Sequence, residues 1–488
     1  MLKADIVIVG GGVVGVSIAR ELARYNVDTV LVEKGSDVAS GTSKANTAIL
    51  HAGFDPEPGT LKALLGLQGN VLYDVMAAEL DVPVRRTGSL VVAFSDEEME
   101  TLEMLLQRGQ ENGVDGLRIV PQDELWSIEP HLNPLASAGL YAKSAGIVNP
   151  FEMVLASAEE AALNGVSFLM GTEVTGFAIR NGQVEQVVTT RRRIEADIVV
   201  NAAGVWADVV AGMVGSNSFK ITPRKGEYMV LDRNAGNLVH TVLFPVPTAL
   251  SKGITVTPTT DGNILLGPTA EDLRDRFDLS TTQEGLSRVL KEAQKLVPLV
   301  SARDTIRVFA GVRAVSNTDD FIVELAREVE GFVNVAGIQS PGVTAAPAIA
   351  RRVVELIRRR TTLTLKECIL RRHRIPAFRD ASPEVRLRLF GSDPKYGRVV
   401  CRCETVTEAE VLDAIHRVPG AHTVDGVKFR TRAGMGRCQG GFCGPRVLEL
   451  LSRELGLSYG HVTLRGEDSR VLTGSSKRGV SESNDGQC

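Results

Sequence analysis

Three glycines near the start of the chain stand at a spacing that could bind a phosphate. Gly10, Gly12 and Gly15 form the pattern G-x-G-x-x-G, in which the backbone can approach an anion closely. The first glycine permits a tight turn, the second admits a pyrophosphate, and the third lets a helix pack on a strand. Glu33 follows where a carboxylate can accept hydrogen bonds from a ribose hydroxyl. Such turns also occur in ordinary strand-to-helix corners, so the flanking elements decide how much weight the pattern has.

The residues around these glycines predict a strand, a turn and a helix, in that order. An apolar run from Ile6 to Val9 is typical of a buried strand, and Ile18, Leu22 and Tyr25 follow at helical spacing. A second apolar run, Thr29 to Val32, predicts the next strand. This context predicts a dinucleotide-binding fold with the pyrophosphate at the N-terminus of the helix.

A loop rich in Gly, Ser and Thr follows in place of a prompt second helix, and it favours a flavin as the dinucleotide. The loop runs from Gly35 to Thr47, and small hydroxyl side chains suit close contact with a phosphate or an isoalloxazine ring. His51 comes just after the loop and could reach a substrate stacked on that ring. The candidate cofactor contacts in this part of the chain are Lys34, Thr42, Ser43, Asn46 and Thr47.

Two later segments could also lie against the cofactor. The segment from Asp197 to Gly204 predicts a buried strand that ends in small residues, which would let the backbone pass close to the cofactor. The turn from Gly337 to Pro347 is expected to lead into a helix that ends near Arg360. The N-terminus of that helix could stabilise negative charge on a reduced flavin, although a plain helix start is the alternative. These segments add the candidates Ala203, Gly204, Gly337, Pro341, Gly342, Val343 and Thr344, and Val174 is a further candidate outside them.

Four cysteines near the end of the chain could bind a metal. Cys401 and Cys403 form one close pair, and Cys438 and Cys443 form the other. Four thiolates can hold either a 2Fe-2S cluster or one Zn²⁺ ion. Zinc sites usually use C-x-x-C pairs, so this spacing fits zinc less well, but it leaves both metals open. Two cysteines remain: Cys368 is expected to be a buried thiol, and Cys488 is incidental in a disordered tail over residues 473–488.

Composition excludes several classes of protein. The chain has 488 residues, which is too long for one core and implies two to four domains. A formal net charge of −4 gives no support to nucleic-acid binding, which would need a clustered basic excess. No run of eighteen apolar residues occurs, so we expect no transmembrane segment. Because the first strand begins by Asp5, there is no room for a cleavable signal peptide, and a cytoplasmic location is expected.

The order of the predicted elements gives an α/β fold class. We expect a Rossmann-like FAD-binding domain with an inserted, mixed β-sheet substrate domain and a small C-terminal helical domain, which the resemblance described next implies to be an iron–sulfur domain. A helix is predicted over Leu61 to Leu80 and a strand over Arg85 to Phe94. The expected boundaries are 1–80, 145–215 and 320–360 for the FAD-binding domain, 81–144 and 216–319 for the substrate domain, 361–395 for a linker, 396–460 for the iron–sulfur domain, and 461–488 for a C-terminal tail.

Four separated segments carry a resemblance to a known family. They are VGGGVVGVSIAREL, SGTSKANTAILHAG, NAAGVWAD and GIQSPGVTAAPAIA. Together they resemble the FAD-dependent oxidoreductases of the D-amino-acid-oxidase and glycerol-3-phosphate-dehydrogenase group over about residues 3–357. The string RAGMGRCQGGFCGPRV is similar to the domain of bacterioferritin-associated ferredoxin. The second resemblance favours a 2Fe-2S cluster over zinc and implies Cys401, Cys403, Cys438 and Cys443 as its ligands.

The first resemblance implies oxidation of a small anionic alcohol, most of all glycerol 3-phosphate, by hydride transfer to flavin N5. His51 is the implied base, since an unperturbed imidazole pKa of about 6.5 suits proton transfer near neutral pH. Lys252 and Arg313 are the implied cations for the substrate anion. L-2-hydroxyglutarate and an amino acid or amine are the alternative substrates. The alternative class is a flavin-bearing electron-transfer or scaffold subunit with a structural zinc site.

A flavin and a cluster in one chain imply that electrons leave toward a partner. Flavin accepts two electrons as hydride and a cluster passes one, which favours a dehydrogenase that feeds partner subunits or a quinone over an oxidase. Between Arg351 and Arg379 stand ten Lys or Arg and two Asp or Glu. Most such runs are solvated, but this run could dock an acidic partner or an anionic lipid surface and allow peripheral membrane association.

Overall fold

The computed structural model describes residues 2–247, 252–466 and 468–474 and has the expected α/β class. The chain divides into two compact units between Arg374 and Ile375. Within the described residues, no helix is both long and apolar enough to cross a membrane.

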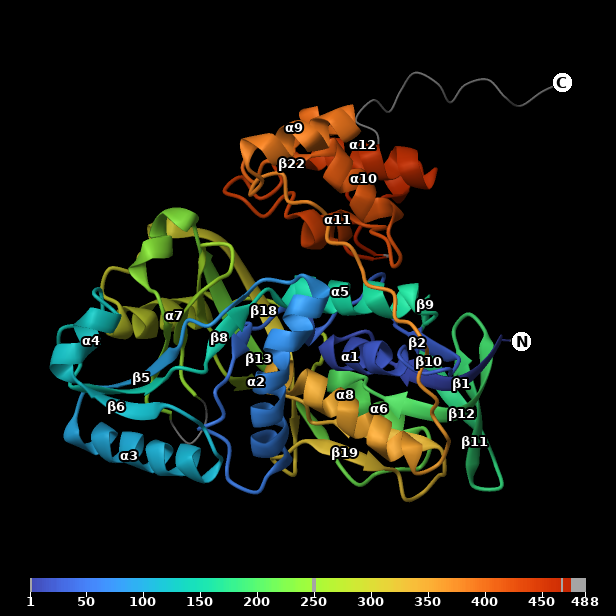
Figure 1. Ribbon diagram of the computed structural model, residues 1–488, viewed down its shortest axis with the longest axis horizontal. Coiled ribbons are helices and arrows are strands. Elements are labelled where there is room, and N and C mark those ends of the chain that lie inside the picture. The colour runs from blue at the N-terminus through green and yellow to red at the C-terminus, as the bar shows by residue number, and fades with distance from the viewer. Residues whose placement is uncertain (1, 248–251, 467, 475–488) are drawn as a thin grey trace. The chain divides into compact units, whose positions relative to one another are not determined.

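The first sheet of the first unit carries the glycine turn at its centre (Figure 1). Strands β1, β2, β9, β12 and β20 run parallel, while β10, β11 and β19 pair antiparallel. The strand order is β10 (Val174–Arg180), β11 (Gln183–Thr189), β12 (Arg193–Asn201), β1 (Leu2–Val9), β2 (Thr29–Val32) and β9 (Ser167–Leu169), with β20 (Phe332–Ala336) on β12 and β19 (Ile322–Leu325) on β20. Parallel strands buried on both faces read as continuous apolar runs, and all four residues of β2 are buried.

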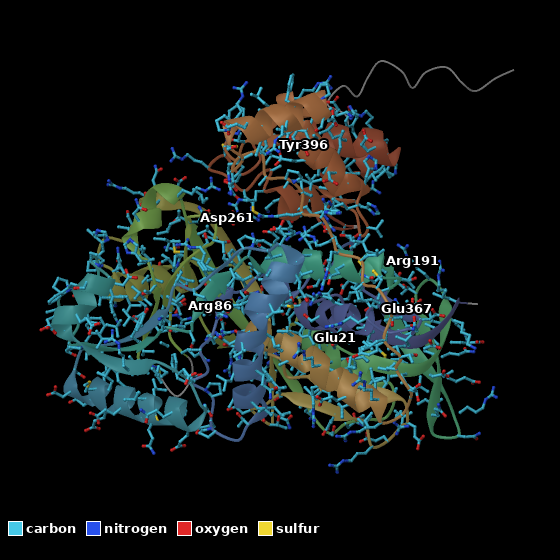
Figure 2. The ribbon with its side chains drawn as sticks, viewed as in Figure 1. Glu21, Arg86, Arg191, Asp261, Glu367 and Tyr396 are labelled. Atoms are coloured by element: carbon cyan, nitrogen blue, oxygen red, sulfur yellow. The ribbon has the colours of Figure 1, made fainter. Side chains whose placement is uncertain are left out.

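The second sheet is mainly antiparallel, as expected for an inserted substrate domain. Its strands come from two separate parts of the chain, and β14 and β5 form a parallel pair where those parts meet. The order is β17 (Glu271–Asp272), β13 (Ile221–Leu231), β16 (Ile264–Gly267), β15 (Thr255–Pro258), β14 (Val242–Pro245), β5 (Ser89–Ala93), β7 (Ala138–Ala142) and β6 (Leu117–Pro121), with β18 (Thr305–Ser316) on β13. A hairpin turn joins β15 to β16, and Asp261 in that turn is labelled in Figure 2.

Eight α-helices of the first unit surround these sheets. They are α1 (Val13–Leu22), α2 (Leu61–Leu80), α3 (Asp96–Glu111), α4 (Gln122–Ile128), α5 (Pro150–Leu163), α6 (Ala207–Gly212), α7 (Gln283–Leu296) and α8 (Gly342–Arg358). Helix α2 has the predicted bounds, and the Thr60 hydroxyl caps its first turn by accepting from the Ala63 N–H. Helix α1 packs against α5 and α8, and α8 also packs against α2.

Helix α8 was predicted to follow a turn that ends at Pro347, but it begins at Gly342. Pro347 therefore lies inside the helix. A proline inside a helix removes one N–H donor and leaves the carbonyl four residues earlier without its helical partner. Here that carbonyl belongs to Val343, and the Tyr73 hydroxyl of α2 donates to it at 2.8 Å. A Cβ on Gly69 of α2 would stand 2.1 Å from the Thr344 carbonyl oxygen, so the two helices pack too closely for a larger residue.

The strand predicted over Arg85 to Phe94 is wrong in one respect, because it is two strands. Strand β4 (Val84–Arg85) joins β8 (Gly146–Val148) in a small sheet with β3 (Ile49–Leu50), whereas β5 belongs to the second sheet. The break falls at Gly88, whose φ of +71° is a left-handed conformation. A Cβ there would also stand 2.8 Å from the ring of Tyr141.

The segment expected to be a linker is divided between the two units. Residues up to Arg374 belong to the first unit, where Arg372 Nε lies 2.9 Å from Glu159 Oε2, with both side chains buried. Arg371 pairs with Glu79 and Glu160. These arginines of the basic run therefore already have carboxylate partners within their own unit, and docking of an acidic partner or lipid by the run stays a prediction. Cys368 is exposed, so the expectation of a buried thiol is wrong.

The second unit is a small helical domain with one short two-stranded sheet. Its elements are α9 (Pro383–Ser392), β21 (Val399–Cys401), β22 (Val406–Thr407), α10 (Glu408–His416), α11 (Val424–Thr431) and α12 (Gly444–Leu455). Apolar side chains of α10, α11 and α12 form its core, which also holds Cys401, Cys443 and Val462. Because Val462 is buried, packed structure continues past residue 460, where the tail was expected to begin. The last fourteen residues, which include Cys488, lie outside the described part.

Candidate functional site

A cavity of about 1050 Å³ in the first unit brings the predicted residues together. Its wall is formed by the glycine turn, the loop after β2, the end of β12, the second sheet and the start of α8. Predicted residues on the wall are Gly10, Gly12, Glu33, Lys34, Thr42, Ser43, Asn46, Thr47, His51, Val174, Ala203, Gly204, Lys252, Arg313, Pro341, Gly342 and Val343. The segments meet because the ends of β1, β2, β12 and β20 lie at one edge of the first sheet.

The glycine turn has the packing that its pattern predicts. A Cβ on Gly10 would stand 2.4 Å from the Ala202 carbonyl oxygen, and a Cβ on Gly15 would stand 1.9 Å from the Gly10 carbonyl oxygen. Gly15 is thus a contact between helix and strand and lies off the cavity wall. Gly12 is different, because its nearest neighbour would be the Ser43 hydroxyl oxygen at 3.2 Å, and it faces the cavity. The cavity therefore leaves room for an anion beside Gly12, at the start of α1.

The carboxylate of Glu33 is fixed between two backbone amides. The Gly11 N–H donates to Oε2 at 2.6 Å and the Gly35 N–H donates to Oε1 at 2.7 Å. Burial raises the pKa of Glu33, while the two amide hydrogen bonds oppose this rise. An ionised carboxylate oxygen can accept more than one hydrogen bond, so contact with a ribose stays open to it.

Lys34 lies over an aromatic ring that the sequence analysis did not single out. Its Nζ atom is 4.0 Å from the centroid of the Trp206 ring, a cation–π distance. The guanidinium of Arg276 also lies over this ring, at 5.4 Å. Burial lowers the pKa of Lys34. Trp206 lies on the cavity wall. In the sequence it closely follows the cofactor candidates Ala203 and Gly204 within NAAGVWAD, and this position could have identified it.

Side chains of the Gly/Ser/Thr loop hold the loop in shape at the cavity wall. The Ser43 hydroxyl accepts from the Val13 N–H at 2.8 Å, which ties the loop to the first turn of α1. The Thr42 hydroxyl donates to the Val312 carbonyl, and the Asn46 amide donates to the Ser43 carbonyl at 2.9 Å. The loop is thereby connected to helix α1 and to strand β18 of the second sheet.

His51 is a buried histidine with an engaged ring nitrogen. Its Nε2 atom lies 3.1 Å from the Ser340 hydroxyl oxygen, and its backbone N–H donates to the Thr344 hydroxyl at 3.0 Å. Burial, followed by the charge of Lys252, lowers the pKa of His51 to about 3. The imidazole is therefore neutral at physiological pH and can accept a proton. Thr344 does not line the cavity, and its hydroxyl contacts His51 at the backbone N–H. Ser340 lines the cavity but was not among the predicted site residues.

Asp55, also missed, forms an ion pair with Lys252 next to His51. Its Oδ2 atom lies 2.5 Å from Lys252 Nζ, and both residues line the cavity. Despite burial, the Lys252 charge and hydrogen bond hold the pKa of Asp55 below its usual value. Asp55 raises the pKa of His51, against the effect of Lys252. Lys252, the implied cation for the substrate anion, thus already has a carboxylate partner beside the histidine.

Arg313 is a second cation on the cavity wall, and it keeps donor capacity. One terminal nitrogen donates to the Thr269 carbonyl at 2.7 Å, and Nε is buried without a hydrogen-bond partner among the described residues. Burial lowers the pKa of Arg313, but an arginine stays protonated under all working conditions. Gly337, by contrast, is off the wall, where a Cβ would stand 2.8 Å from the Ser316 side chain.

The four cysteines of the second unit stand as two touching pairs. The Cys403 thiol lies 3.7 Å from the sulfur of Cys438. The Cys443 thiol donates to Cys401 and lowers the Cys401 pKa to about 6. Within the described residues, no three or more His, Cys, Asp or Glu side chains are arranged to hold a metal ion, so the cysteines meet as pairs and not as a group of four.

The loop around Cys438 is shaped to receive an anionic sulfur. The backbone N–H groups of Phe442, Gly440 and Gly441 donate to the Cys438 sulfur and lower its pKa. A Cβ on Gly436 would stand 2.4 Å from the Cys403 Cβ, so this glycine lets the two cysteine loops approach. Two cysteine pairs, one of them with several amide donors, fit a cluster of two irons, each of which takes two thiolates.

Comparison with known proteins agrees with both halves of this description. Residues 5–356 match the family model described as FAD dependent oxidoreductase, and residues 399–453 match the model of the BFD-like [2Fe-2S] binding domain. The chain belongs to the family of FAD dependent oxidoreductases and carries a BFD-like 2Fe-2S domain. Its cofactors are accordingly FAD in the first unit and a 2Fe-2S cluster in the second, which confirms both predictions of cofactor.

The relatives include proteins that share either the whole chain or its first unit. A glycerol 3-phosphate dehydrogenase of Caloramator mitchellensis is 44% identical and covers 98% of this chain and 99% of its own length. A glycerol 3-phosphate oxidase of Mycoplasma genitalium is 34% identical over 73% of this chain and 95% of its own. The FAD-bound L-alpha-glycerophosphate oxidase of Mycoplasma pneumoniae superposes with a TM-score of 0.72 at 33% identity, covering 76% of this chain and 98% of its own.

Proposed function

We propose that this protein oxidises glycerol 3-phosphate to dihydroxyacetone phosphate and passes the electrons on through its 2Fe-2S cluster. The observation that carries the proposal is the set of groups on one cavity wall: a neutral, buried histidine, an ion-paired lysine and an arginine. The relatives that bear the names glycerol 3-phosphate dehydrogenase and oxidase support this choice of substrate.

Arg313, Lys252 and His51 have separate roles toward the substrate. Arg313 offers its guanidinium to the phosphate, because a guanidinium is a planar donor suited to anionic oxygens. Lys252 adds positive charge on the same cavity wall, with its position held by Asp55. His51 accepts the hydroxyl proton, and Ser340 fixes the orientation of its ring through Nε2. When bound, FAD supplies the acceptor for the hydride that leaves the adjacent carbon.

The binding of FAD is assigned to the remaining part of the wall. Gly10 and Gly12 with the start of α1 would hold the pyrophosphate, Glu33 the ribose, and Lys34 with Trp206 the adenosine end. The loop with Ser43 and Asn46, the small residues Ala203 and Gly204, and the start of α8 complete the wall. Fixed amide and hydroxyl groups of this kind leave the cofactor well placed beside His51.

An anaerobic substrate panel tests the proposal. Glycerol 3-phosphate is expected to bleach the flavin absorbance within seconds, whereas L-2-hydroxyglutarate and proline are expected to leave it oxidised. Glycerol without phosphate is the matched control, since it has the same reacting group and lacks the anion that Arg313 would bind. Bleaching by L-2-hydroxyglutarate or proline alone would refute the proposed substrate, and no bleaching by any of these compounds would refute the dehydrogenase function.

A further inference from the structure

Phe442 is the most exposed large apolar side chain among the described residues, with 87% of its surface accessible. It lies in the loop between Cys438 and Cys443, and its N–H donates to the Cys438 sulfur. The loop geometry needs this amide and the glycines before it, but it makes no use of a phenyl ring. Burial of such a ring stabilises a protein by about 1.5–3 kcal/mol, so leaving it in water is a cost without a benefit to folding.

The residue directly before each of the two touching cysteines is an arginine. From Gly426 to Arg446 the chain has five Lys or Arg and no Asp or Glu, and three of the five, Lys428, Arg432 and Arg446, pair with carboxylates from outside this range. Arg402 and Arg437 are exposed, and each directly precedes one of the two touching cysteines, Cys403 and Cys438. The acidic residue that follows Cys403 is buried and paired with two arginines, so it adds no negative charge at the surface.

We propose that Phe442, Arg402 and Arg437 form a docking face for a protein that accepts one electron at a time and presents an acidic surface around an apolar recess. We call these three residues, with Cys403 and Cys438, the cluster face. Apolar contact by Phe442 holds the complex together, and the arginines steer the acidic partner into place. The inference rests on the proposed function, in which electrons leave through the cluster.

The electrons balance with two transfers per substrate. Oxidation of one alcohol to a ketone removes two electrons and two protons, and the cluster gives one electron to each of two acceptor molecules. No covalent bond forms or breaks at the cluster face. The acceptor is reduced by one electron in each encounter, and it must leave before the next acceptor binds.

Two small acceptor proteins of opposite charge provide the test. Plastocyanin is acidic and cytochrome c is basic, and each accepts one electron. The holoenzyme is reduced photochemically without substrate and mixed with either acceptor in a stopped-flow instrument. We expect faster reduction of plastocyanin than of cytochrome c at low ionic strength, with the difference lost as salt is added. Affinity is measured separately by calorimetry with zinc-substituted plastocyanin, which cannot accept an electron.

The variants separate the apolar contact from the charges. Phe442→Ala is expected to weaken plastocyanin binding at least tenfold and to leave the salt dependence unchanged. Arg402→Glu is expected to slow the reduction of plastocyanin about tenfold at low salt and to speed that of cytochrome c. Leu387→Ala and Arg388→Glu are the matched controls, because both residues are exposed on α9 of the same unit. These controls are expected to behave as the unchanged protein does.

Three results would overturn the inference. One is an equal effect of the α9 controls, and another is a preference for cytochrome c at low salt. The third is a slower reduction of the cluster by the flavin in Phe442→Ala when no acceptor is present, because the face would then serve the first unit of its own chain. Photochemical reduction bypasses the substrate, so the docking result stands even if glycerol 3-phosphate fails to reduce the flavin.

Discussion

His51 has the surroundings of a base that is kept neutral until substrate arrives. A buried imidazole with a pKa of about 3 holds no proton at neutral pH, and an incoming phosphate dianion would raise that pKa toward a useful range. Substitution His51→Asn is expected to slow anaerobic flavin reduction by about 10²–10⁴-fold, the usual contribution of a general base, while FAD stays bound. Ser340→Ala is the control and should slow it less, since it removes only the orienting contact. An unchanged rate in His51→Asn would exclude the base role.

The ion pair of Asp55 and Lys252 should make a contribution to stability that depends on pH. The folded pKa of Asp55 lies below its unfolded value, so the contribution is present above about pH 4 and is lost as the pH falls through the folded pKa. Each side chain is about a quarter to a third exposed (26% and 31%), which limits the effect to about 1 kcal/mol. Lys252→Met should therefore lower Tm by a few degrees at pH 7 and by less at pH 3, measured by calorimetry. An equal loss at both pH values would contradict the assignment.

The residues that sequence reasoning missed share one cause. Ser340 contacts His51 although 289 positions separate the two in the sequence. Asp55 pairs with Lys252, which lies just before strand β15 of the second sheet. Residue type and local spacing predicted the glycine turn and Glu33, because those contacts form between neighbouring elements of one strand–helix–strand unit. Contacts between distant segments depend on how the inserted sheet folds back onto the first sheet, and local pattern contains no information about that.

Predicted helices and strands agree with the observed ones where the sequence signal for the element is local. Strand β2 and helix α2 have the predicted bounds, because the apolar run of the strand and the apolar period and capping hydroxyl of the helix define their ends. Helix α8 was predicted to start after Pro347 for an equally local reason, and it starts earlier because Tyr73 satisfies the Val343 carbonyl. Tyr73→Phe is expected to destabilise the first unit by about 1–2 kcal/mol, since the buried carbonyl loses its donor. Denaturant unfolding would measure this, with no change expected in the second unit.

The segment after α8 holds α5 through a buried ion pair. Arg372 and Glu159 are 5% and 7% exposed in their side chains, and Arg372 also donates to the Leu80 carbonyl. Removing one partner of a buried pair leaves an uncompensated charge, so Arg372→Ala is expected to cost about 3–5 kcal/mol of the free energy of unfolding. Arg374→Ala is the matched control, with a more exposed pair to Glu152 and an expected cost below about 1 kcal/mol. If the double variant Arg372→Met with Glu159→Met recovered none of the loss, the ion pair would not be its source.

For the whole molecule, the two units supply chemistry that neither has alone. The first unit has a cavity suited to a two-electron oxidation, and the second has four cysteines suited to one-electron transfer. The second unit thereby makes a dehydrogenase a better proposal than an oxidase, because it gives the electrons a route other than oxygen. A metal site at the four cysteines was predictable from their spacing, which is a local feature, whereas the choice of a 2Fe-2S cluster over zinc needed the resemblance to a known domain.

Cys438→Ser tests that division of labour. The unchanged protein is expected to contain iron and acid-labile sulfide at about two of each per chain, and the variant much less, because one ligand and its amide-lined loop are lost. Glycerol 3-phosphate should still bleach the flavin in the variant at a similar rate, since the cavity is unaltered. Transfer to a one-electron acceptor protein should fall by tenfold or more, while consumption of oxygen stays low in the unchanged protein and rises in the variant. Stoichiometric zinc without sulfide, or undiminished transfer in Cys438→Ser, would show that electrons do not leave through these cysteines.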